Sequence, residues 1–295
     1  MTKIALIGCG AMGGAIGTRL VEVGTSLTVF DLSEAAMQVL VDKGARAAGS
    51  AAEAAAASDF IVLSLNSAAI VRAAVFGAAG VAEGAKPGSL IIDMSSIDPP
   101  STKALAKDAA QKGLRWLDCP LSGGAPKVRT GDLTVMAGGA AEDFAQARTV
   151  MDHLCANFTH MGPSGAGQTT KLINQVLCAL GFMAVAEATR LAQDAGVDAA
   201  KIPVALKGGR ADSAILQEYM PRMAQKDYTP TGRIANMVKD LNGAQDLARL
   251  THTAMPLTNL CAEVHRLMTA AGFGDADQAA LMEFFEGPDA AGVPK

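Results

Sequence analysis

The 295-residue sequence is poor in the residues that mark several classes of protein. Aromatic residues make up only 4% of it, although half of the residues are hydrophobic, so a core must be built mainly from aliphatic side chains and methionine. The 25 Lys and Arg residues are outnumbered by 29 Asp and Glu residues, the net charge is -4, and no basic run occurs. Because phosphate binding requires a basic surface, this balance argues against a nucleic-acid partner.

Signatures of disulfides, metal sites and membrane spans are missing as well. The five cysteines include no C-x-x-C pair, and the four histidines have no metal-ligand spacing. The longest apolar run, residues 176–186, is shorter than the roughly 20 residues that cross a bilayer. The N-terminus enters a strand-like run directly, without a signal-peptide cleavage site. We therefore expect a cytoplasmic protein with reduced thiols, no metal and no membrane partner.

A glycine-rich turn is present near the start of the chain. A buried-strand pattern at residues 4–7 is followed by Gly8-Cys9-Gly10-Ala11-Met12-Gly13, and a helical pattern then runs to Gly24. This is the G-x-G-x-x-G arrangement that lets a helix N-terminus receive a pyrophosphate. The alternative is a glycine-rich turn without a ligand. We predict dinucleotide binding at Gly8, Gly10, Ala11, Met12 and Gly13.

The second expected strand, residues 27–30, ends in a residue that bears on cofactor choice. Asp31 can accept hydrogen bonds from both ribose hydroxyls and would repel a 2′-phosphate. No Arg or Lys follows closely, so NAD is favoured over NADP. The alternative is that Asp31 only caps the next helix.

Further strands are expected at residues 60–65, 89–93 and 115–118, and two more at 133–137 and 158–161. Ligands bind at the carboxyl ends of strands in a doubly wound sheet. Leu65, Asn66 and Ser96 stand at such ends and are candidates for cofactor contact, with ordinary turn residues as the alternative. After the strand at 115–118, Ser122, Gly123 and Gly124 offer a hydroxyl and backbone amides that suit a carboxylate. An ordinary loop is again the alternative.

The pattern changes in the middle of the chain. The glycine-rich stretch at 162–167 leads into a helix expected over about residues 165–195, roughly 45 Å long. This helix is apolar on most faces, so we expect it to be buried between domains or between subunits. Lys171 and Asn174 share one face of it.

The remainder of the chain is expected to be helical, and the length of the chain suffices for two domains. We predict an α/β Rossmann domain over residues 1–163 and an all-α domain over residues 164–295, joined by the long helix. The final Gly-, Pro- and Ala-rich residues are expected to fray. Helix breaks are expected at Pro203, Gly208-Gly209, Pro221, Pro230, Pro256 and Gly272.

Four motifs occur in one order: Gly8-x-Gly10-x-Met12-Gly13, Asp118-x-Pro120-x-Ser122-Gly123-Gly124, the stretch 162–174, and Lys239-Asp240-Leu241. Together they resemble the β-hydroxyacid dehydrogenase family, which includes 3-hydroxyisobutyrate dehydrogenase, tartronate semialdehyde reductase and L-threonate dehydrogenase and is related to 6-phosphogluconate dehydrogenase. The resemblance covers nearly the whole chain.

The resemblance implies an NAD(P)-dependent oxidoreductase that transfers a hydride between nicotinamide and a small hydroxy acid, such as 3-hydroxyisobutyrate or a four-carbon sugar acid. It makes Lys171 the general acid–base and Asn174 the residue that orients substrate and lysine. It places the substrate carboxylate at Ser122-Gly123-Gly124, and Ser96 and Lys239 near the cofactor. It also implies a homodimer or homotetramer.

Two departures from the family pattern are visible. Leu65-Asn66 stands where many members have Leu-Pro, and Thr231-Gly232 stands where many have Gly-Phe, which should reshape the substrate pocket. Two other functions compete with the dehydrogenase: an imine reductase-like enzyme and a non-catalytic NAD-binding interaction module. The presence of Lys171, Asn174 and Ser122 argues against both.

Overall fold

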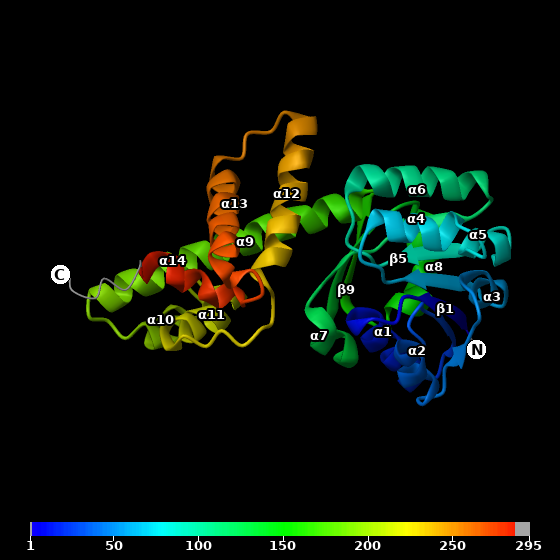
Figure 1. The fold of residues 1–295 in the computed structure, drawn as a ribbon, viewed down its shortest axis with the longest axis horizontal. Coiled ribbons are helices and arrows are strands. Elements are labelled where there is room, and N and C mark those ends of the chain that lie inside the picture. Colours follow the sequence, from blue (N-terminus) through cyan, green and yellow to red (C-terminus); the bar gives the residue numbers. More distant parts are fainter. Residues whose placement is uncertain (1, 287–295) are drawn as a thin grey trace. The chain divides into compact units, whose positions relative to one another are not determined.

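The first part of the chain forms a nine-stranded sheet in the computed structural model, which describes residues 2–286 (Figure 1). The strands are β1 (Lys3–Ile7), β2 (Ser26–Phe30), β3 (Arg46–Ala47), β4 (Phe60–Leu63), β5 (Leu90–Asp93), β6 (Arg115–Asp118), β7 (Leu121–Ser122), β8 (Leu133–Gly138) and β9 (Cys155–Gly162).

The order of the sheet is β3-β2-β1-β4-β5-β6-β8-β7, and β9 pairs with β8. Neighbouring strands from β3 to β6 run parallel, whereas β8 runs antiparallel to β6 and β7. The strand order reverses between β1 and β4, and a doubly wound sheet opens its ligand crevice at such a point. The glycine turn leaves β1 at this crevice.

Helices cover both faces of the sheet because alternate strand residues point to opposite sides. Ile4 and Leu6 belong to a core that also contains Ile16 of the first helix, whereas Ala5 and Ile7 belong to a second core on the other face. Figure 1 shows α1 and α2 on one side of the strands and α4, α5 and α6 on the other. The helices of this part are α1 (Ala11–Glu22), α2 (Glu34–Val41), α3 (Ala51–Ala56), α4 (Ala68–Phe76), α5 (Val81–Gly84), α6 (Pro99–Gln111), α7 (Gly124–Thr130) and α8 (Ala141–Met151).

The regular elements of the second part of the chain are helices, apart from one isolated antiparallel bridge between Arg233 and Asp277 among the described residues. The first compact unit ends at Lys171 and the second begins at Leu172, within the long helix α9. The elements are α9 (Ala166–Asp194), a 3-10 turn (Ala199–Lys201), α10 (Ile202–Leu206), α11 (Ala214–Gln225), α12 (Ile234–Thr251), α13 (Pro256–Met268), a π-helical turn (Thr269–Phe273), a 3-10 turn (Gln278–Leu281) and α14 (Met282–Glu286).

The predicted fold class is confirmed, with an α/β unit followed by the long helix and a helical region. The prediction of a helix break at Pro221 is wrong, since this proline lies inside α11. A proline inside a helix costs about 3 kcal/mol, but α11 buries Leu216, Tyr219, Met220 and Met223 in the core of the second unit. Burying four large apolar side chains outweighs one lost hydrogen bond. The Gly-, Pro- and Ala-rich end lies outside the described residues.

Part of the apolar surface of α9 is exposed in the single chain, and burial of α9 between domains or between subunits stays a prediction. Ile173, Leu177 and Leu191 are each more than half exposed in the structure of the single chain. Among the described helices, α9 alone is long and apolar enough to cross a membrane, but core helices of soluble proteins can share this length and composition. Length and composition therefore do not assign α9 to a membrane.

Candidate active site

The glycine turn after β1 is packed closely against neighbouring strand ends. Gly8 has a φ of 97°, and its N–H donates to the carbonyl oxygen of Phe30 at 2.9 Å. A Cβ on Gly8 would lie 2.3 Å from the carbonyl oxygen of Ser64, and a Cβ on Gly13 would lie 1.9 Å from the carbonyl oxygen of Gly8. Both positions therefore require glycine, and their close contacts bring α1 directly against the sheet.

Gly10 has open space around it. A Cβ placed there would meet no described heavy atom within 4 Å, and no side chain in residues 2–286 caps the N-terminus of α1 at this residue. The amides at the start of α1, on Ala11, Met12 and Gly13, thus stand at the positive end of an uncapped helix. This cradle fits the pyrophosphate of a dinucleotide, and contact of these residues with it stays a prediction.

Asp31 ties the glycine turn to the end of β2. Its Oδ2 accepts from the N–H of Cys9 at 2.6 Å, and its Oδ1 accepts from the N–H of Ser33 at 2.8 Å. Ser33 is the residue that caps α2, by accepting from the N–H of Ala36, so the capping alternative for Asp31 is wrong. Each carboxylate oxygen keeps a lone pair with which it can accept a ribose hydroxyl.

The thiol of Cys9 lies in the same turn and is buried. Burial, and secondarily the Asp31 carboxylate, raises the pKa of this thiol to about 12. The thiol therefore stays protonated at neutral pH and is a poor nucleophile.

The predicted contact residues after β4 and β5 lie on two connected loops. The N–H of Leu65 donates to Ser95 Oγ at 3.0 Å, and the strand register pairs Leu63 with Asp93. Asn66 is exposed and Ser96 is half-buried. The structure thus brings these two loops together at the carboxyl end of the sheet, as predicted. Their contact with a cofactor stays a prediction.

Two fully buried carboxylates, Asp93 and Asp118, end the adjacent strands β5 and β6. Sequence reasoning placed both in strand ends and gave neither a role. Asp118 Oδ1 accepts from the N–H of Gly165 at 2.7 Å, and its Oδ2 accepts from the N–H of Gln168 at 3.0 Å. Burial raises the pKa of Asp118 in spite of these hydrogen bonds. Asp118 therefore satisfies amides at the start of α9, as a capping carboxylate does.

Asp93 is less well satisfied. Its Oδ1 accepts from the N–H of Ser95 at 3.0 Å, whereas its buried Oδ2 has no hydrogen-bond partner among the described residues. Burial, with a smaller contribution from the charge of Asp118, raises the pKa of Asp93 from 3.8 to about 7. Ionisation of Asp93 therefore opposes folding.

Asp93→Asn should flatten the pH dependence of stability. The folded protein binds the Asp93 proton more tightly than the unfolded chain does. The resulting stabilisation is fully present below pH 3.8, the pKa in the unfolded chain, and is lost as the pH rises to about 7, the pKa in the folded protein. A tenfold change in the acid dissociation constant corresponds to about 1.4 kcal/mol, so the parent should lose roughly 2–3 kcal/mol between about pH 5 and pH 7.5 relative to the variant. Urea unfolding of both proteins at several pH values measures this difference. Parallel pH profiles would contradict the assignment.

The segment predicted to hold a carboxylate is a strand end followed by a helix start. Ser122 of β7 pairs with Thr134 of β8, and Gly124 opens α7. The alternative of an ordinary loop therefore does not describe this segment, and carboxylate binding at Ser122, Gly123 and Gly124 stays a prediction. Gly123 and Gly124 have φ values of 122° and 69°, which L-side chains rarely adopt. The half-buried Ser122 thus stands at a sharp turn into the first turn of a short helix.

The start of α9 is packed against the ends of β6 and β8. Gly162 and Gly165 have φ values of 133° and 89°, which L-side chains rarely adopt, so glycines allow the chain to turn from β9 into α9. A Cβ on Gly167 would lie 2.5 Å from the carbonyl oxygen of Met136. Lys171 is half-buried on the next turn of α9 and is the last residue of the first unit. The glycines therefore fix the helix backbone just ahead of the lysine.

In the second unit, Asn174 and Lys239 are linked through two residues that sequence reasoning gave no role. Asn174 Nδ2 donates to Gln175 Oε1 at 3.0 Å, and Gln175 Nε2 donates to Asp240 Oδ2 at 2.5 Å. Lys239 Nζ lies 3.7 Å from Asp240 Oδ1. The network joins α9 to α12 and sets the two predicted residues on neighbouring helices. The Lys-Asp pair in the sequence was the available signal for Asp240.

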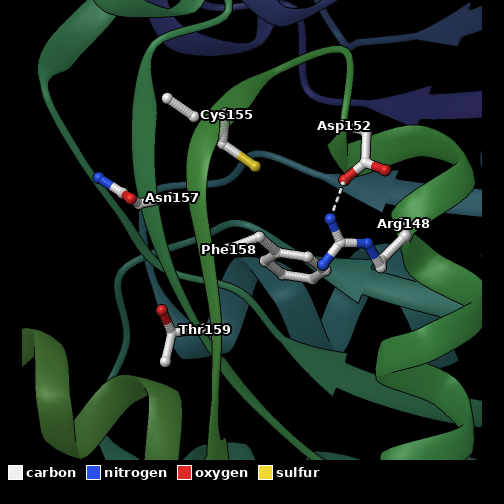
Figure 2. Close-up of a pocket in the computed structure, with 7 residues that line it drawn as sticks. Arg148, Asp152, Cys155, Asn157, Phe158 and Thr159 are labelled. Carbon is white, nitrogen blue, oxygen red and sulfur yellow. Dashed lines mark ion pairs between the residues drawn. The ribbon is translucent and has the colours of Figure 1, made fainter.

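A hollow of about 380 Å³ lies elsewhere, beside the edge strand β9 (Figure 2). Arg148 and Asp152 line it and form an ion pair of 3.2 Å, with both side chains about half exposed. Exposed ion pairs of this kind contribute little to the stability of the fold. The residues that line the hollow include none of the predicted site residues, so it is separate from the candidate site.

Comparisons with known proteins match both halves of the chain. Residues 3–162 match the family model of the NAD binding domain of 6-phosphogluconate dehydrogenase. Residues 165–285 match the family model described as the NAD-binding region of NADP-dependent 3-hydroxyisobutyrate dehydrogenase.

Individual relatives match over nearly their full lengths. The chain is 34% identical to 2-hydroxy-3-oxopropionate reductase of Escherichia coli, over 96% of this chain and 97% of the relative. It is 32% identical to the NAD-dependent L-serine dehydrogenase of Pseudomonas aeruginosa, over 97% and 98% of the two chains. A solved structure of Mycobacterium tuberculosis 3-hydroxyisobutyrate dehydrogenase with L-serine has a TM-score of 0.88, 29% identity, and coverage of 97% and 99%.

Proposed function

The chain belongs to the β-hydroxyacid dehydrogenase family and is an NAD(P)-dependent oxidoreductase that acts on the CH–OH group of a small hydroxy acid, and we propose that Lys171 is its general acid–base. The observation that carries this proposal is the start of α9. There Asp118 and the glycines fix the backbone just before a half-buried lysine. A fixed helix can hold an amine in line with a reacting hydroxyl.

The proposed reaction uses three groups of this chain. Backbone amides and the hydroxyl of Ser122-Gly123-Gly124 bind the substrate carboxylate. Lys171 takes the proton of the substrate hydroxyl during oxidation and returns it during reduction. Asn174 donates a hydrogen bond to the same oxygen and holds it in position. The bound nicotinamide supplies the hydride acceptor or donor.

The cofactor would be held by the glycine turn and Asp31. The open space at Gly10 admits the pyrophosphate, and the half-exposed Asp31 carboxylate can accept both ribose hydroxyls. The same carboxylate would repel a 2′-phosphate, so we propose a preference for NAD over NADP.

We propose a 3-hydroxy acid of about three or four carbons as the substrate. Serine, 3-hydroxyisobutyrate and 2-hydroxy-3-oxopropionate, which occur in the names of the relatives, share a carboxylate and an oxygen on C3. In all three molecules, a carboxylate bound at Ser122 would place the oxygen on C3 at the same distance from the Ser122 turn. A four-carbon sugar acid such as threonate is the alternative.

A substrate and cofactor screen tests this function. NADH or NADPH absorbance is followed with L-serine, 3-hydroxyisobutyrate, glycerate and threonate, and cyclic imines are included for the reductase alternative. We expect turnover of at least one 3-hydroxy acid. The value of kcat/KM should be at least about 10-fold higher with NAD than with NADP, because the Asp31 carboxylate repels the 2′-phosphate of NADP. Asp31→Ser should narrow this ratio. NAD binding without turnover of any acid would favour the non-catalytic module.

A further inference from the structure

The buried side chain of Gln168 spans the backbone on both sides of Ser96. Its Nε2 donates to the carbonyl oxygen of Ser95 at 2.7 Å, and its Oε1 accepts from the N–H of Ile97 at 3.3 Å. Gln168 is only 1% exposed, so water does not compete for either bond. The side-chain amide of Gln168 thus donates one hydrogen bond to the loop backbone and accepts another from it, as the backbone of an adjacent strand would. We call these two hydrogen bonds the Gln168 bridge.

The backbone of the same residue is also fixed. The N–H of Gln168 donates to Asp118 Oδ2 at 3.0 Å, while Asp118 Oδ1 holds Gly165. The loop at its other end is held in turn, since Ser95 Oγ accepts from the N–H of Leu65. The first turn of α9, the end of β6 and the loops after β4 and β5 therefore share one largely buried network within the first unit.

We propose that Gln168 is a positioning residue that sets Lys171 relative to the Ser96 loop. Lys171 follows three residues later on α9, and residues at this spacing lie on the same side of a helix. The proposal rests on the proposed role of Lys171. A displacement of about 1 Å in a reacting group can cost about 10²-fold in rate. The Gln168 bridge is therefore expected to affect turnover more than cofactor affinity.

Two variants separate the hydrogen bonds from simple packing. Gln168→Met keeps the length and bulk of the side chain and removes both bonds. It should lower kcat by about 10- to 100-fold, with a clearly smaller rise in the Kd of NADH, because the glycine turn and Asp31 are untouched and only the predicted contact at Ser96 is loosened. Unchanged kcat, or a loss of NADH affinity in proportion to kcat, would overturn the proposal.

Gln168→Glu provides a rescue. A protonated glutamic acid has one donor for Ser95 and one acceptor for Ile97, whereas a glutamate has no donor. Asp118 on β6 accepts a hydrogen bond from the backbone of this residue, Asp93 on β5 accepts one from the backbone of Ser95, and Lys103 of α6 lies close to Gly165. The readout is the turnover of each variant in the reduction direction, divided by the turnover of the parent at the same pH. This ratio should rise for Gln168→Glu as the pH falls, because the side chain becomes protonated, and should stay constant for Gln168→Met. Flat ratios for both would overturn the proposal.

Hydrogen exchange of the cofactor-free protein supplies a readout that does not need activity. In Gln168→Met, the N–H of Ile97 loses its acceptor, so its exchange should accelerate by about 10-fold or more while amides in the strands stay protected. Unchanged protection of Ile97 would overturn the Gln168 bridge. If the parent turns over none of the hydroxy acids, the proposed function fails, and the exchange result still decides whether Gln168 fixes this loop.

Discussion

Lys171→Ala is expected to lower kcat by about 10²–10⁴-fold, the range that general acid–base catalysis contributes. The variant removes the amine proposed to exchange the hydroxyl proton. The backbone at this point is held by groups that the substitution does not touch, namely the Asp118 carboxylate and Gly165. NADH affinity, measured by fluorescence titration, should therefore stay within about 3-fold of the parent, and thermal unfolding should be similar, as for most partly exposed positions.

Lys171→Arg is the matched control for charge. It keeps a cation on α9, but a guanidinium does not deprotonate and so cannot act as a base near neutral pH. We expect its kcat to fall nearly as far as that of Lys171→Ala. If only the positive charge of Lys171 mattered, the arginine variant would retain most of the activity. Near-normal turnover in either variant would remove Lys171 from the proposed mechanism.

The sequence predicts the frame of the fold well because local patterns determine it. The strand at 115–118 is found at the predicted residues, and the helix predicted over about 165–195 is observed as α9 (Ala166–Asp194). The strand β4 is buried on both faces and reads as an apolar run, and a long apolar helix has no competing pattern. The two-residue strands β3 and β7 are not predicted, because so short a segment carries no periodicity.

The site is less predictable because its connections are not local. Asp118 and Gln168 are 50 residues apart, and Gln168 reaches Ser95 across 73 residues. No pattern in the sequence pairs them. A buried Asp at the end of an apolar strand also reads as an ordinary turn residue, since its burial follows only from the sheet packing. Glycines give a stronger signal, because a positive φ or a close backbone contact can be met by few other residues.

The second large effect is expected in the glycine turn, where alanine at Gly13 should lower the stability of the fold and alanine at Gly10 should lower the affinity for NADH. Gly13→Ala places a Cβ 1.9 Å from the carbonyl oxygen of Gly8. This neighbour is backbone, so it cannot rotate away as a side chain would, and α1 must shift from the sheet. We expect the free energy of unfolding to fall by about 3 kcal/mol or more, which is the upper end of the range for substitutions that overpack a core. Urea unfolding without cofactor measures it.

Gly10→Ala is the matched partner of this experiment. Gly10 has a φ of -61°, which alanine adopts freely, and a Cβ there meets no described atom within 4 Å. Its free energy of unfolding should therefore stay within about 1 kcal/mol of the parent. The same Cβ would occupy the space through which the pyrophosphate approaches the backbone, so the Kd of NADH should rise by about 10-fold or more. If Gly10→Ala bound NADH as tightly as the parent, the dinucleotide would have to lie elsewhere, because the only steric change made by that variant is in this cradle.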